Sequence, residues 1–111
     1  MSRPFKGTIT MPANTNAQRL SDLLRAVVGT GGDTGCSTRY RSWTIIADQA
    51  NTGSLYIGGA GVASTNYGVI LAATDSWTVG EGNMLNNETA EAYWIRGSAN
   101  SQILHFDGRI A

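Results

Sequence analysis

Residues 53–76 read GSLYIGGAGVASTNYGVILAATDS, and the rest of the chain is predicted to be organised around this stretch. It holds two short apolar runs, at residues 55–57 and 67–72, separated by glycine and small polar residues. A polar break, Thr74-Asp75-Ser76, follows the second run. Short apolar runs bounded by turn-forming residues are typical of strands. The stretch therefore predicts two consecutive strands joined by a tight loop, and it contains no catalytic motif.

A further strand is predicted before this stretch, at residues 40–48, where side chains alternate with a period of two. The alternation places Trp43 and Ile45 in the core and Tyr40 on the opposite face. In the second strand of the opening stretch, residues 67, 69 and 71 are expected to share one face.

More extended segments are predicted downstream. Residues 77–79 begin one, and residues 92–96 and 102–106 form two more. The five residues 97–101, Gly-Ser-Ala-Asn-Ser, are typical of a hairpin loop between the last two strands. Asp107-Gly108 is interpreted as another turn.

The first 14 residues are interpreted as an N-terminal arm and first strand. Phe5, Gly7 and Ile9 alternate with polar residues until Met11-Pro12, and proline cannot donate to a strand ladder. Two interpretations stay open for this segment. It forms either the first edge strand of a sheet or an arm that docks on a neighbouring subunit.

One α-helix is predicted at about residues 16–28. Thr15 and Gln18 fit a capping box at its start, and Gly29 fits the left-handed residue that ends a helix. Its apolar stripe consists of Leu20, Leu23, Leu24, Val27 and Val28, with Arg19, Ser21, Asp22 and Arg25 on the other face.

Together these elements predict a mainly β protein: a single antiparallel β-sandwich or jelly-roll-like domain, residues 15–111, of about seven strands with one N-terminal helix. Two strands carry large groups on both faces. Tyr56 lies opposite Leu55 and Ile57, and Trp94 lies opposite Tyr93 and Ile95. A sheet with one solvent-exposed face carries mainly polar residues on that face, so we expect the helix, a neighbouring copy or a partner to cover these outer residues.

The composition of the chain limits the classes of function that it can have. The 111 residues suffice for one domain with a core, and eight basic and eight acidic residues give a formal charge of zero. Charged residues make up 14%, against about 25% in ordinary domains. Nucleic-acid binding needs clustered lysine and arginine, so no nucleic acid is expected, whereas a near-zero charge favours association. No signal peptide and no membrane-spanning segment is expected.

Groups that could carry chemistry are few. Cys36 is the only cysteine and His105 the only histidine, so neither a disulfide nor a metal-ligand spacing is present, and no metal or cofactor is predicted. His105 is interpreted as a packed or surface residue. The glycine-rich residues 29–35 lack the ending of a phosphate-binding loop and follow a helix rather than precede one. The aromatic residues are interpreted as core and subunit interface, with a sugar-stacking platform as the alternative.

The successive segments LYIGG, NYGVILAATDS and YWIRGSANSQILHF resemble small β-sandwich proteins and modules of tailed-bacteriophage particles. The resemblance covers residues 43–106. It consists of structural glycines and core positions, followed by an acidic-Ser turn and a closing hairpin. The chain departs from the pattern at residues 73–75, where proline or glycine is expected before the acidic residue.

The resemblance implies a non-enzymatic structural protein of the virion. Its expected role is that of a capsid decoration (cement) protein on the particle exterior, made in the host cytoplasm. Its expected partners are itself, with a trimer favoured, and the major capsid protein or other virion proteins, with no membrane involved. The alternative is a tail or tail-fibre component that binds a receptor or carbohydrate. Candidate interface residues are Arg3, Phe5, Tyr56, Tyr67 and Trp94.

Overall fold

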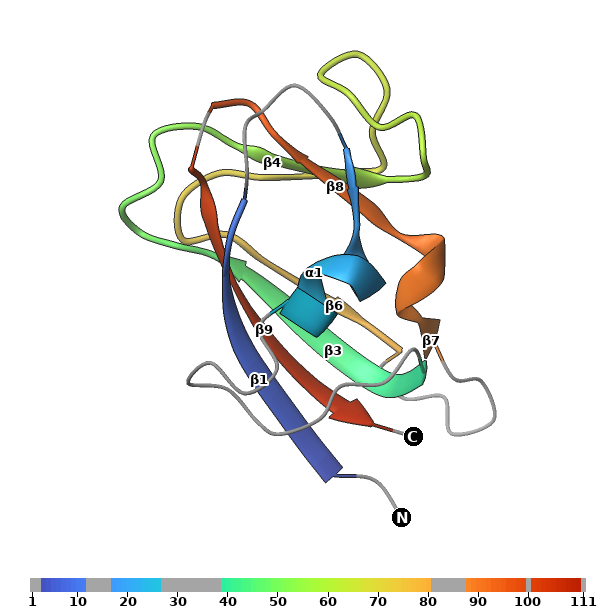
Figure 1. Ribbon diagram of the computed structural model, residues 1–111. Helices are drawn as coiled ribbons and strands as arrows, with labels where there is room; N and C mark the ends of the chain where they lie inside the picture. Colours follow the sequence, from blue (N-terminus) through green and yellow to red (C-terminus); the bar gives the residue numbers. More distant parts are fainter. Residues whose placement is uncertain (1–2, 12–16, 27–38, 81–87, 100, 111) are drawn as a thin grey trace.

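The computed structural model describes residues 3–11, 17–26, 39–80, 88–99 and 101–110 (Figure 1). In chain order its elements are β1 (Arg3–Thr10), β2 (Gln18–Arg19), α1 (Leu20–Ala26), β3 (Arg39–Ala47), β4 (Leu55–Gly58), β5 (Val69–Leu71), β6 (Ser76–Val79), β7 (Glu88–Thr89), the 3-10 helix η1 (Ala90–Ala92), β8 (Trp94–Gly97) and β9 (Ile103–Ile110). Among these described residues, β2 and β7 have two residues each and seven strands are longer. The predicted seven or so strands and one helix are therefore confirmed.

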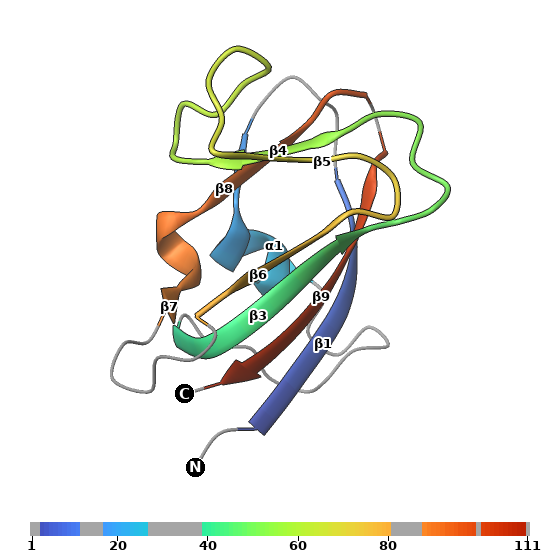
Figure 2. The same ribbon diagram turned by 180° about the vertical axis from the view of Figure 1, so that it is seen from behind.

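The strands form two antiparallel sheets packed face to face as a β-sandwich (Figures 1 and 2). The first sheet has the order β1-β9-β3-β6, with β7 also pairing with β3, and the second has the order β2-β8-β4-β5. Four pairs, β1·β9, β2·β8, β3·β6 and β4·β5, are nested within one another along the chain. Such a chain is one long antiparallel ribbon, and rolling it up places β9 beside β3 and β8 beside β4.

This rolled ribbon is the jelly-roll form of the sandwich. The predicted fold class is confirmed, and residues 53–76 form the closed end of the ribbon, where β4 pairs with β5.

Alternate residues of both sheets build the core between them. Trp43 is almost fully buried, and its ring meets the rings of Tyr40 and Tyr93 edge-on, at centroid distances of 5.8 and 5.2 Å. Edge-to-face packing of this kind is favoured by the charge distribution of aromatic rings. The other fully buried large side chains are Phe5, Leu20, Leu24, Ile45, Leu55, Ile57, Ile95, Leu104 and Phe106. The predicted core positions of Trp43 and Ile45 are confirmed.

Tyr40 is buried in this core, which corrects its predicted outward position. The register of β3 against β9 shifts between Tyr40 and Ser42, so alternation breaks there, as it does at a β-bulge. Gly108 of β9 leaves space for the ring, because a Cβ at Gly108 would lie 3.0 Å from Tyr40 Cδ1 and 2.7 Å from Phe106 Cε1. The predicted turn at Asp107-Gly108 is therefore wrong, since both residues continue β9.

The helix begins at Leu20 rather than at residue 16. Gln18 belongs to β2 and pairs with Ile95 of β8, so the predicted capping box is wrong: tertiary pairing overrides the local helix signal. Leu20, Leu23 and Leu24 are buried as expected, but Ser21, predicted on the polar face, is only 2% exposed. The predicted end of the helix lies outside the described residues.

Several connections cross between the sheets at one end of the sandwich, among them β3 to β4, β5 to β6 and β8 to β9. The predicted hairpin between the last two strands is therefore wrong, because β8 and β9 belong to different sheets. Side chains hold the crossings together. Asn51 accepts a hydrogen bond from the Ile103 N–H and donates one to the Ile103 carbonyl, both at 2.8 Å. Gln102, 2% exposed, accepts one from the Gly53 N–H at 2.8 Å.

The β5–β6 crossing contains the site where proline or glycine was expected. Thr74 has a φ of 73°, in the left-handed region that favours glycine. Its N–H donates to the Ala47 carbonyl at 3.0 Å, and the Asp75 carboxylate accepts the Ala72 N–H at 3.0 Å. The predicted role of Asp75 as a turn residue is confirmed.

The first strand, β1, is an edge strand that pairs with β9 from Arg3 to Thr10. Of the two interpretations of this segment, the edge strand is confirmed. Phe5 is fully buried and packs against Phe106 at a ring-centroid distance of 6.2 Å. Its predicted place at an interface is corrected: it belongs to the core.

Candidate functional site

The outer face of the second sheet gathers the large side chains that the core does not use. Inward residues of β8 and β4 are buried, so the residues between them point outward. The strand register places Arg19 beside Trp94 in one row, and Arg96, Tyr56 and Ile70 side by side in the next. We call this surface the aromatic face; it consists of Arg19, Tyr56, Tyr67, Ile70, Trp94 and Arg96.

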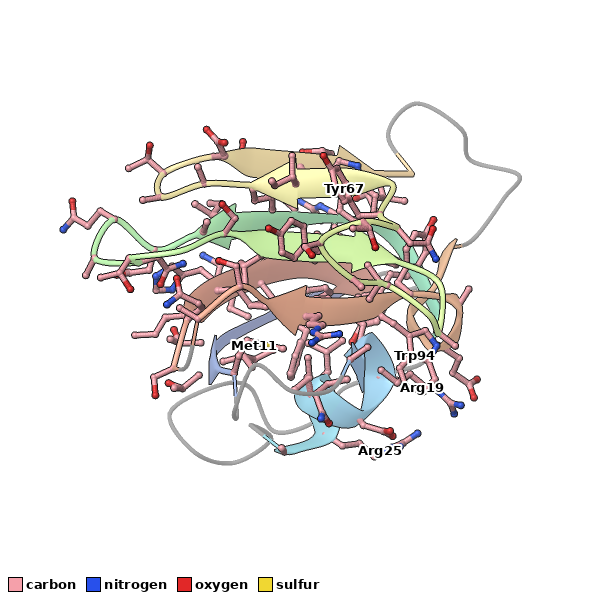
Figure 3. The ribbon with its side chains drawn as sticks, turned by 90° about the horizontal axis from the view of Figure 1, so that it is seen from above. Met11, Arg19, Arg25, Tyr67 and Trp94 are labelled. Atoms are coloured by element: carbon pink, nitrogen blue, oxygen red, sulfur yellow. The ribbon has the colours of Figure 1, made fainter. Side chains whose placement is uncertain are left out.

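At one side of the face, Arg19 of β2 stacks on Trp94 of β8. The guanidinium carbon lies 4.9 Å from the centre of the Trp94 ring, a cation–π contact. Figure 3 looks down on the second sheet and shows the two side chains together, with Tyr67 near the β5 edge. The Arg19 Nε is buried and has no hydrogen-bond partner among the described residues. The contact that the structure shows for this guanidinium is therefore the stacking on Trp94.

At the other side, Tyr56 of β4 and Tyr67 pack together at a ring-centroid distance of 5.3 Å. Tyr67 precedes β5 in the chain and is 46% exposed. The prediction that it shares a face with Leu71, which is buried, is therefore wrong. Ile70, the cross-strand neighbour of Tyr56, is 45% exposed. The exposed side chains of Tyr67 and Ile70 thus each adjoin the half-buried Tyr56.

The loop between β4 and β5, residues 59–68, is tied to itself by hydrogen bonds. The Val62 N–H donates to the Gly59 carbonyl at 3.0 Å, and Ala63 and Asn66 exchange two backbone bonds of 2.9 and 3.0 Å. The Asn66 side chain adds a bond to the Gly61 carbonyl at 3.2 Å. Val62 is buried and anchors the loop to the body of the protein. Ser64, at the loop tip, is therefore held in a defined position.

A hollow of about 290 Å³ opens beside Tyr56. Its lining comes from three parts of the chain: Tyr56 of β4, Ser64 of the loop, and Arg96, Gly97 and Ser98 at the end of β8. The Ser98 hydroxyl accepts the Ser54 N–H at 2.8 Å, which fixes the rim. One cation, one aromatic ring and two hydroxyl groups thus converge on the hollow.

The two outer faces of the sandwich differ in chemistry. The outward strand residues of the second sheet include two arginines and no lysine, aspartate or glutamate. The outer face of the first sheet is rich in threonine, with Thr44 and Thr78 hydrogen-bonded at 2.9 Å, and charges of both signs line it. Its one strongly exposed apolar side chain among the described residues is Ile46, at 39%.

A carboxylate–imidazole–hydroxyl row lies on that first sheet. The His105 Nε2 is 2.7 Å from Asp48 Oδ1, and its Nδ1 is 3.2 Å from the Thr8 hydroxyl. The hydrogen bond from His105, aided by one from the Ala50 N–H, holds the pKa of Asp48 below its usual value. Because the three side chains come from β1, β9 and the end of β3, the row links neighbouring strands, and we assign it a structural role. His105 is thus a half-exposed surface residue.

Three of the five predicted interface residues, Tyr56, Tyr67 and Trp94, meet on the aromatic face. Phe5 does not, and the Arg3 side chain lies outside the described part of the structure. Arg19 was missed because it was placed on a helix. Arg96 and Ile70 could have been found, since Arg96 follows Trp94 by two residues and Ile70 alternates with inward neighbours.

No described helix is long and apolar enough to cross a membrane. In the part of the chain that the structure describes, no three His, Cys, Asp or Glu side chains group as metal ligands, and Cys36 lies outside that part. Comparisons of the chain with models of known protein families, with curated proteins and with solved structures give no match.

Proposed function

We propose that this protein is a non-enzymatic structural component of a bacteriophage virion, a capsid decoration protein that binds the major capsid lattice through its aromatic face. The observation that carries the proposal is the composition of that face: one tryptophan, two tyrosines, two arginines and an isoleucine. Tryptophan, tyrosine and arginine are the residues most enriched at binding hot spots, and lysine, aspartate and glutamate are depleted there. The resemblance of residues 43–106 to phage modules supplies the kind of particle.

The extent of the face favours a protein partner over a small ligand. The six side chains come from all four strands of the second sheet and the loop before β5. Exposed apolar groups that adjoin one another in this way mark interaction surfaces more often than isolated ones do. We also propose that the protein self-associates, with a trimer favoured, because a formal charge of zero leaves little electrostatic repulsion between copies.

Sedimentation of the purified protein with virions stripped of it tests the proposal. Tyr56→Ala and Trp94→Ala are each expected to bind about 30-fold more weakly than the wild type, since truncating a hot-spot residue costs about 2 kcal/mol or more. Ile46→Ala is the matched control, because it removes an exposed apolar group from the other sheet. Equal binding by all four proteins would contradict docking through the aromatic face. A protein that stays a stable monomer at micromolar concentration would contradict self-association.

A second candidate is a tail or tail-fibre module that binds a receptor carbohydrate. The observation that favours it is the hollow beside Tyr56, where an aromatic ring and hydroxyl groups adjoin. It predicts saturable glycan binding that Tyr56→Ala abolishes. Absence of any response on a glycan array would remove it.

A further inference from the structure

We propose that the outer edge of β6 is a contact between two copies of this chain, in which the two β6 strands pair antiparallel about a two-fold axis at Thr78. The inference rests on the self-association part of the proposed function and names the strand through which copies meet. A two-fold contact joins single copies into a dimer, and it joins two trimers into a closed hexamer.

β6 ends the first sheet without a partner strand on its outer side. Among the described strands it pairs with β3 alone, and β1 forms the opposite edge of that sheet (Figure 2). α1 lies at the β1 and β2 side of the sandwich, and β5 and β6 lie at the other side (Figure 3). Trp77 and Val79 of β6 pack against the core but are only half-buried. Core side chains are therefore partly uncovered along β6.

The backbone groups of Thr78 face this edge. The Ala47 N–H donates to the Asp75 carbonyl at 2.8 Å, so the backbone groups of Ala47 point toward the β6 side of β3. This direction alternates along an antiparallel strand, so Ile45 and its partner Trp77 form a hydrogen-bonded pair. Thr78 is the next residue of β6, and its N–H and carbonyl therefore point away from β3. They can donate to and accept from another strand.

The sequence of β6 lacks the features by which edge strands usually avoid pairing with other chains. Those features are charged residues, proline, a bulge or a very short strand. Of the other edges, β1 contains Pro4 and Lys6, and β2 has only two residues. β6 reads Ser-Trp-Thr-Val, and its register with β3 is regular throughout. The pairing capacity of β6 is thus unprotected.

The edge is complementary to a second copy of itself. With Thr78 opposite Thr78 of the second copy, the two residues exchange N–H···O=C bonds, and Trp77 of each copy lies opposite Val79 of the other. Pairs of an aromatic and a β-branched side chain stabilise neighbouring strands, and these pairs cover the half-exposed core groups. β6 brings no charge to the axis, whereas two paired β1 strands would bring two copies of Lys6 into one contact.

Sedimentation velocity of the full chain at micromolar concentration tests the contact with substitutions of Thr78. Thr78→Pro removes an N–H that faces the edge and leaves the backbone bonds to β3 in place, so the variant should fold and its assembly should have half the wild-type mass. Thr78→Val is the matched control. It loses the hydroxyl bond to Thr44, 2.9 Å long, but keeps the N–H, and it should keep the wild-type mass.

Thr78→Lys is the second disruptive variant, and it takes the place of Thr78→Pro if that protein fails to fold. It keeps the N–H but puts two like charges at the axis, so it should also halve the mass.

Oxidative cross-linking places the axis. Residues in a hydrogen-bonded antiparallel pair have Cα atoms about 5.5 Å apart, within the range of a disulfide. Thr78→Cys, in a Cys36→Ser background, should therefore form a covalent dimer on oxidation. Ile46→Cys in the same background is the control, because residue 46 is exposed but lies on β3, so its two copies are three strand spacings or about 14 Å apart.

Several results would overturn the inference: a monomeric wild type, a wild-type mass for both Thr78→Pro and Thr78→Lys, or cross-linking of Thr78→Cys no greater than that of Ile46→Cys. Loss of association by Thr78→Val would overturn it as well, because the side chain rather than the strand edge would then join the copies. A monomeric wild type whose binding to stripped virions is lost in Thr78→Pro would assign the edge to a strand of the capsid protein and contradict a second copy.

Binding of the wild type to stripped virions separates this inference from the docking proposal. If the wild type binds the particles and its mass does not change in the disruptive variants, the β6 contact is wrong and docking through the aromatic face stands. If Thr78→Pro halves the mass but the wild type does not bind the particles, the β6 contact stands and the docking proposal is wrong.

Discussion

Replacing Gly108 with alanine tests how the aromatic core is packed. The added Cβ would lie 2.7 and 3.0 Å from two atoms of the Phe106 ring and 3.0 Å from the Tyr40 ring. Carbon atoms pack best at about 3.5–4.0 Å, so both rings must move by roughly half an ångström or more. Both are fully buried and touch the Trp43 ring, at centroid distances of 6.0 and 5.8 Å. Overpacking of this kind costs about 1–3 kcal/mol.

A smaller gain opposes this cost, because alanine restricts the unfolded chain by about 0.4–1 kcal/mol more than glycine does. We therefore expect Gly108→Ala to lower the free energy of unfolding by about 1–2 kcal/mol, measured by urea denaturation. Gly59→Ala is the matched control: no atom lies within 4 Å of its added Cβ, so its stability should equal or slightly exceed that of the wild type. A Gly108→Ala protein as stable as the Gly59→Ala protein would refute the packing described for Tyr40.

Three further predictions concern single groups. The Asp48 pKa lies below its usual value of 3.8, so its carboxylate contributes stability that is complete above that pH and is lost as the pH falls through the lowered pKa. An NMR titration should show the lowered Asp48 pKa, and His105→Asn should raise it. Gln102→Ala should lower the free energy of unfolding by about 1–3 kcal/mol in urea, because the Gly53 N–H loses its partner; no change would contradict the bond. Thr74→Gly should raise the melting temperature, since left-handed backbone costs a β-branched residue about 1–2 kcal/mol, and a lower melting temperature would contradict the strained turn.

Periodicity in the sequence was enough to predict most of the inner face. Trp43, Ile45, Leu55 and Ile57 alternate with polar or outward residues and are all buried. The predictions that were wrong concern features that depend on pairing between segments distant in the sequence. Nothing local shows that residue 18 pairs with Ile95 instead of starting the helix, or that a bulge turns Tyr40 inward. The predicted hairpin between the last two strands was wrong for the same reason. Two strands joined by five residues have the same sequence pattern whether they pair with each other or belong to different sheets.

The candidate site was predictable where aromatic residues stand opposite apolar ones. Tyr56 and Trp94 were found in this way because a solvent-exposed face does not require large rings. Arg19 was not found, because its place depends on β2, a two-residue strand with no pattern of its own. The hollow beside Tyr56 also needs Ser64 and Ser98, which are 34 residues apart and meet only through the fold.

The most direct test of the account is the copy number of this protein in purified virions, measured by quantitative mass spectrometry against the major capsid protein. A decoration protein repeats with the symmetry of the shell, so the account predicts copies on the order of hundreds per particle. A count of roughly a dozen or fewer would contradict it and place the protein at the tail or at a single vertex.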